Sequence, residues 1–89
     1  SVVVCRRGGA STAFQRLNMY ADMSNMIHAT SQYWNIVYGC SPEETHHDVE
    51  GLQIMRTLAD NVAWLLKCTR GKIDEIPERE KYTPYNFIR

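Results

Sequence analysis

The residues most suited to chemistry form a short glycine-rich turn near the start of the chain. This 6–11 turn follows the apolar residues 2–5, precedes a helical pattern, and consists of Arg6, Arg7, Gly8, Gly9, Ala10 and Ser11. In open α/β sheets, ligands bind beyond the carboxyl ends of strands, on the turns that lead into helices. The arginines supply positive charge, and the glycines let backbone N–H groups approach a flat or anionic ligand. The turn is therefore a candidate ligand-binding site, and a simple strand-to-helix connection is the plainer interpretation of the same residues.

A second group of reactive side chains lies in a polar loop, and its members are Cys40, Glu43, Glu44, His46, His47 and Asp48. Thiolate, imidazole and carboxylate groups are the ligands that zinc takes in proteins. Adjacent histidines point apart on an extended chain, however, and no HxH or HxxxH spacing places two imidazoles on one face. We therefore expect a solvated loop that caps the following helix and no metal site. A metal-binding regulator that uses Cys40, His46 and His47 is the third-ranked hypothesis.

Two strands and two helices must position these residues. Residues 2–5 and 33–38 are rich in β-branched or aromatic side chains, which predicts strands. Apolar residues at helical spacing predict helices over residues 12–27 and 49–69. The order strand, helix, strand, helix indicates a parallel sheet. Two parallel strands are not a stable sheet by themselves, because both faces and the free edges need cover.

Short polar residues and glycine predict where the two helices begin and end. Ser11 or Thr12 is expected to cap the first helix, and Thr45 or Asp48 the second, because their side chains accept hydrogen bonds from orphan N–H groups. Gly71 is expected to end the second helix.

The composition is that of an ordinary globular chain and excludes several function classes. The 89 residues include ten Lys+Arg and ten Asp+Glu, so the formal net charge is zero. Because nucleic-acid binding relies on basic side chains that neutralise phosphates, we expect no nucleic-acid partner. No apolar run approaches the roughly 20 residues that a membrane-spanning helix needs, so we expect no membrane partner. Three widely spaced cysteines form no disulfide framework, which favours a reducing, cytoplasmic location.

Three segments together carry a resemblance to a known family: RRGGA after the first expected strand, SQYWN at the second, and DVEGLQIMRTLADNVAWLLK in the last helix. With them, the chain resembles the carboxyl-terminal half of flavodoxin-like NADPH-dependent FMN reductases, relatives of the iron–sulfur flavoproteins. The resemblance implies an α/β fold, a flavodoxin-like doubly wound parallel sheet of strand order 2-1-3-4-5. This chain would supply its last two strands and helices (β-α-β-α).

The resemblance also implies a flavin site at the 6–11 turn. Backbone N–H groups of Gly8, Gly9 and Ala10 would face the polar edge of FMN, and NAD(P)H would be the co-substrate. No side chain need act as an acid or base, so no catalytic residue is assigned. Tyr33 and Trp34 are expected in a core or interface, with Trp34 against the flavin or nicotinamide as the alternative. The family's phosphate loop and the cysteine cluster of its iron–sulfur branch are absent from this sequence.

Because the phosphate loop is absent, the chain is expected to be one part of a larger domain and to have partners. Residues 1–71 are expected to be the carboxyl-terminal half of an FMN-binding domain, and residues 72–89 a surface or interface tail. The expected partners are the upstream half of the same domain, further copies in a homodimer or homotetramer, and a small-molecule electron acceptor. The first-ranked function is an FMN-dependent oxidoreductase. The alternative is a non-catalytic fragment or truncated paralogue that acts in assembly or dimerisation.

Overall fold

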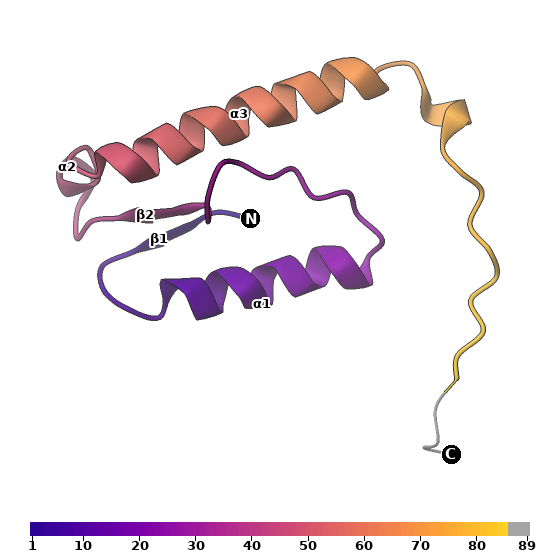
Figure 1. The fold of residues 1–89 in the computed structure, drawn as a ribbon. Helices are drawn as coiled ribbons and strands as arrows, with labels where there is room; N and C mark the ends of the chain where they lie inside the picture. Colours follow the sequence, from indigo (N-terminus) through magenta and orange to yellow (C-terminus); the bar gives the residue numbers. More distant parts are fainter. Residues whose placement is uncertain (86–89) are drawn as a thin grey trace.

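The two expected strands form and run parallel, which confirms the α/β character of the chain. The computed structural model describes residues 1–85, in which β1 (Val3–Cys5) pairs with β2 (Ile36–Tyr38) in a two-stranded sheet. Val3 lies opposite Ile36, and Cys5 lies opposite Tyr38. Helices α1 (Ala10–Met23) and α3 (Val49–Thr69) flank the strands, as Figure 1 shows. Both strands are shorter than predicted. β1 begins at Val3 and β2 at Ile36, although the carbonyl of Asn35, just before β2, still accepts from the Val3 N–H at 3.0 Å.

Helix α1 begins earlier and ends earlier than the sequence pattern predicted. Its N-cap is Gly9, which has a φ of +90° and offers no side-chain cap, so the prediction of Ser11 or Thr12 as the cap was wrong. At its other end Asn25 takes the left-handed conformation with a φ of 53°. The N–H of Met26 then bonds to the carbonyl of Ala21, which closes the last turn in the manner of a Schellman motif.

Helix α3 has the bounds that the apolar spacing predicted. Asp48 is its N-cap, and Gly71, with a φ of +74°, follows its last turn. Thr45 is not a cap: it lies at the end of α2 (Pro42–Thr45), a short helix that the sequence pattern did not predict. Ser41 caps α2 by accepting from the N–H of Glu44, and the Thr45 hydroxyl donates to the carbonyl of Pro42.

The core is small and lies where both helices cross β2. Its buried apolar residues are Ala10, Ile36, Val37 and Ile54. Asn35 is the buried polar residue, and its amide donates to the carbonyl of Ser1 at 3.1 Å. Many large apolar side chains stay exposed, among them Val4 of β1 at 64%. The described residues therefore bury one strand well and leave the other open.

The two edges of the sheet differ. On the outer edge of β2, the N–H of Tyr38 donates to Asp48, and the Ile36 carbonyl lies under the first turn of α3 beside Gly51. On β1, Val3 and Cys5 bond to β2, so alternation directs the N–H and carbonyl of Val4 to the opposite edge. No described segment pairs with β1 there. The sheet is thus closed on one side and open on the other.

Beyond α3 the chain is exposed throughout its described part. It forms one turn of 3₁₀ helix, η1 (Ile73–Glu75), and residues 77–85 then lead away from the helices (Figure 1). Phe87 and Ile88 of the expected interface tail lie outside the described residues. Over the described range, no helix combines the length and the apolarity needed to cross a membrane.

Candidate functional site

The 6–11 turn lies at the carboxyl end of β1, as the sequence predicted, but only residues 6–9 are outside the helix: Ala10 and Ser11 are the first two residues of α1. Arg6, Arg7, Gly8 and Gly9 are exposed there, whereas Ala10 packs its methyl group into the core. The Cys5 thiol donates to the carbonyl of Arg7 at 2.7 Å, which ties the turn to the strand. Ala10 can therefore offer a ligand only its backbone, while the arginines offer charge.

The start of α1 is an open, electropositive surface. No side chain caps it and its first turn carries no acidic residue. Unpaired N–H groups and the aligned peptide dipoles give a helix start a partial positive charge. A Cβ atom built on Gly8 or Gly9 would meet no atom of the described residues within 4 Å, so no part of residues 1–85 covers the glycines. Together with Arg6 and Arg7, this arrangement suits an anionic or electron-rich planar ligand.

The carboxyl end of β2 brings a second polar group beside this turn. The N–H of Cys40 donates to Glu44 Oε2 at 2.7 Å, and this bond lowers the pKa of Glu44. The Glu44 carboxylate in turn raises the pKa of the Cys40 thiol, and the Arg6 guanidinium opposes that effect in part. Arg6 and Cys40 are therefore neighbours. Cys40 is held as a thiol, which is the opposite of an activated nucleophile.

Trp34 does not lie beside the 6–11 turn within one chain. It precedes β2 at the amino end of the sheet, whereas the turn leaves the carboxyl end of β1. Its ring packs against Tyr33, with centroids 5.3 Å apart and planes tilted by 32°. The two elements expected to touch a flavin are thus separated by the length of the strands.

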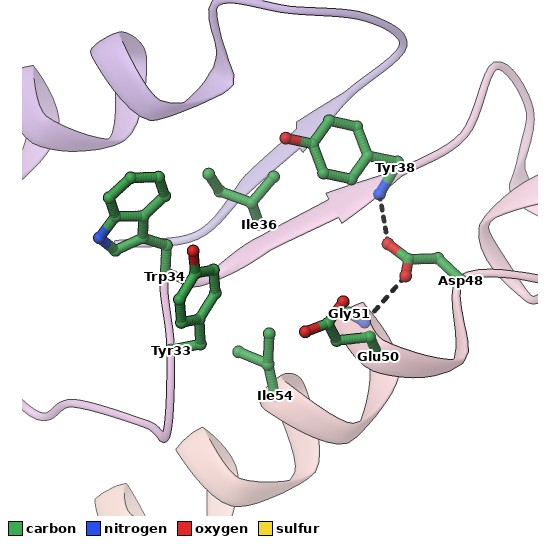
Figure 2. Close-up of a pocket in the computed structure, with 8 residues that line it drawn as sticks. All are labelled: Tyr33, Trp34, Ile36, Tyr38, Asp48, Glu50, Gly51 and Ile54. Atoms are coloured by element: carbon green, nitrogen blue, oxygen red, sulfur yellow. Dashed lines mark hydrogen bonds between the residues drawn. The ribbon is translucent and has the colours of Figure 1, made fainter.

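The aromatic pair instead lines a cavity that the sequence analysis missed. Figure 2 shows this cavity, of about 70 Å³, along the outer edge of β2 beneath α3. Its lining residues are Tyr33, Trp34, Ile36, Tyr38, Asp48, Glu50, Gly51 and Ile54. The sequence did contain one signal for this cavity: Ile36 and Tyr38 alternate along β2, and alternate residues of a strand lie on the same face.

The loop of possible metal ligands does not form a cluster. Among residues 1–85, no three His, Cys, Asp or Glu side chains gather so that they could hold a metal ion. Glu44 bonds to Cys40, and Asp48 bonds to the backbone of Tyr38 and Gly51. The loop therefore serves to cap α2 and α3.

Compared with protein-family models, with curated proteins and with solved structures, the chain matches none. Its function is therefore inferred from its own geometry.

Proposed function

We propose that this chain is part of an FMN-dependent oxidoreductase of the flavodoxin-like, doubly wound type. The observation that carries the proposal is the 6–11 turn: it is glycine-containing, basic and uncovered, and it joins the carboxyl end of a parallel strand to an uncapped helix. Ligands of open parallel sheets bind at such turns. The reaction would pass a hydride from NAD(P)H to the flavin and then reducing equivalents to a small acceptor.

The residues of the turn fit one side of a flavin. Backbone N–H groups of Gly8, Gly9 and Ala10 would bind the carbonyl and nitrogen edge of the ring, and Arg6 and Arg7 would add positive charge. When bound, FMN supplies the hydride-accepting ring. The chain's own residues orient that ring and stabilise negative charge on its polar edge, which is the usual contribution of a protein to flavin chemistry. No described side chain is assigned a proton-transfer role.

Other parts of the site would come from outside residues 1–85. The upstream half of the domain would bind the phosphate of FMN, and a second copy in a homodimer or homotetramer could place its Trp34 against the flavin or nicotinamide. This proposal puts the protein in the cytoplasm, where NAD(P)H and small acceptors are available.

Flavin titration tests the proposal. The protein that contains this chain is added to FMN and, in parallel, to riboflavin, and quenching of flavin fluorescence is followed. We expect both flavins to bind, because the 6–11 turn contacts the ring rather than the phosphate. Anaerobic addition of NADPH should then bleach the visible absorbance of the bound flavin. A protein that binds neither flavin would exclude this function.

A second candidate function, a non-catalytic assembly element, is favoured by the open edge of β1. Val4 is exposed on that strand, and the buried core of the described part of the chain comprises four apolar residues. An unpaired edge accepts a strand from another chain. Sedimentation velocity and the flavin titration together separate the two candidates. An oligomer that binds no flavin favours the assembly function, whereas a protein that binds flavin favours the oxidoreductase.

A further inference from the structure

We propose that the cavity between β2 and α3, here named the aromatic cavity, binds an alkylammonium group. Its eight lining residues are those drawn in Figure 2. None of them belongs to the 6–11 turn, so this proposal does not depend on the flavin function. The recognising groups are the adjacent rings of Tyr33 and Trp34 and the carboxylate of Glu50.

The rings supply the first part of the recognition. Figure 2 shows Tyr33 and Trp34 side by side near the start of β2, Ile36 on β2, Ile54 on α3 below Tyr33, and Tyr38 at the far end of the cavity. Aromatic faces carry negative charge density and attract cations, and quaternary ammonium groups are bound in this way by sets of rings. A cavity of about 70 Å³ also exceeds the space that one water requires, roughly 10–15 Å³. An ammonium group with its methyl or methylene carbons fits this description.

The charge of the lining supplies the second part. Among residues 1–85, the lining includes the carboxylates of Asp48 and Glu50 and contains no Lys, Arg or His. Both oxygens of Asp48 accept backbone N–H groups, from Tyr38 and Gly51. Glu50 differs, because it forms no hydrogen bond or ion pair with any residue from 1 to 85, and in Figure 2 its carboxylate points toward the side of Tyr33 and Ile54. A cationic ligand would satisfy this carboxylate, whereas an anion would be repelled by it.

The cavity is both held in shape and accessible. The Ser31 hydroxyl donates its one proton either to the carbonyl of Tyr33, at 2.7 Å, or to the side-chain oxygen of buried Asn35, at 2.6 Å. The N–H of Ile36 donates to the carbonyl of Trp34 at 2.7 Å. These bonds fix the backbone that carries the two rings. Residues Tyr33 and Trp34 are 62% and 46% exposed, so a ligand enters without a conformational change.

The test compares a cation with its neutral carbon isostere. Choline and 3,3-dimethylbutan-1-ol are titrated into the full chain, and the NMR shifts of the Gly51 amide and the Trp34 indole are followed. We expect choline to bind about fivefold more tightly than the neutral alcohol, as a partly exposed cation–π site allows. N-acetyl-lysine amide is a third probe. Tighter binding of this probe than of choline identifies a protein lysine as the ligand, and weaker binding identifies a small quaternary ammonium.

Two variants and a control locate the binding. Glu50→Gln removes the unpaired carboxylate and should weaken choline binding about twofold to fivefold, with little effect on the fold because Glu50 is exposed. Trp34→Leu should weaken it further. Asp60→Asn removes the same charge from α3 outside the cavity and should leave affinity unchanged. Equal affinity for choline and the alcohol, absence of binding by both cations, or equal effects of Glu50→Gln and Asp60→Asn would overturn the proposal.

Discussion

The carboxylate of Asp48 accepts a hydrogen bond from the backbone N–H of Tyr38 at 2.8 Å, so the residue that caps α3 also holds the end of β2. Its second oxygen accepts from the N–H of Gly51 at 2.9 Å. One side chain therefore joins the strand and the helix that line the aromatic cavity.

Replacement of Asp48 by alanine should destabilise the protein. The variant loses an N-cap, worth about 0.5–2 kcal/mol, and leaves the Tyr38 N–H without its acceptor, which costs about 1 kcal/mol more. Asp48→Asn keeps one acceptor oxygen and should fall between wild type and Asp48→Ala. Urea unfolding followed by circular dichroism measures the change, with exposed Asp60→Ala on the same helix as the control. Equal midpoints for Asp48→Ala and the control would contradict this role.

Gly51→Ala should also destabilise the protein, against the ordinary preference for alanine in a helix. That preference is worth about 1 kcal/mol. At Gly51, however, a Cβ would collide with the Asp48 carboxylate and lie 3.1 Å from the Ile36 carbonyl oxygen. We expect a net loss of about 1–3 kcal/mol by urea unfolding, as for other overpacked sites. Gly8→Ala, where a Cβ meets nothing within 4 Å, is the control and should be nearly neutral. A stabilised Gly51→Ala variant would show that this contact relaxes freely.

Gly9→Val should weaken FMN binding if the 6–11 turn contacts the flavin. Gly9 has a φ of +90°, which a β-branched residue cannot adopt without strain, so the turn must change shape. We expect a loss of affinity of about tenfold, equivalent to about 1.4 kcal/mol, in the flavin titration. Gly71→Val is the matched control, because Gly71 also has a positive φ of +74° but follows the far end of α3. If both variants lose affinity equally, the loss reflects general destabilisation and not a contact with FMN.

Cys40 should react with alkylating agents faster after Glu44→Gln. The Glu44 carboxylate raises the pKa of the thiol, so its removal lowers that pKa and increases the thiolate fraction at a given pH. Arg6→Gln should have the opposite effect, because the Arg6 guanidinium lowers the same pKa. Rates of iodoacetamide reaction against pH, in a background with Cys5→Ser and Cys68→Ser, give the order. Glu43→Gln is the control, and a rate change as large as that of Glu44→Gln would argue against a specific contact.

Val4→Lys should prevent association if the chain acts as an assembly element. The substitution places a charge on the open edge of β1, a common way to block strand pairing. We expect the dimer dissociation constant from sedimentation to rise at least about tenfold, which corresponds to about 1.4 kcal/mol. Tyr20→Lys, on the exposed side of α1, is the control. A wild-type protein that stays monomeric at every concentration would exclude the assembly function.

The sequence predicted α3 fully because its apolar residues recur at helical spacing and polar Asp48 and Gly71 stand at its ends. The ends of α1 were predicted less well, since they depend on backbone conformation. Gly9 and Asn25 take left-handed conformations there, and the apolar Met26 and Ile27 continued the pattern past the real end of the helix. A single residue in the left-handed conformation can therefore end a helix even where the apolar spacing continues for several more residues.

The 6–11 turn was placed correctly because the parallel order of strand and helix fixes where such a turn lies. The aromatic cavity could not be predicted in the same way. Tyr33 and Trp34 belong to one segment and Glu50 to another, and they line one cavity because β2 packs against α3, where Asp48 bonds to Tyr38 and Ile36 and Ile54 are buried. The bond between Asp48 and Tyr38 joins residues ten positions apart in the sequence, and the short helix α2 lies between them. No hydrophobic pattern in the sequence predicted α2.

The closed outer edge of β2 limits how copies of this chain can stack. A filament of stacked strands requires each copy to have two free sheet edges. In this chain Asp48 and the start of α3 cover one of them, the outer edge of β2. If the chain acts as an assembly element, strand-to-strand contact between identical copies should therefore stop at a pair, with the β1 strands at its centre. In such an assembly, the Asp48 carboxylate that caps α3 would also block open-ended polymerisation.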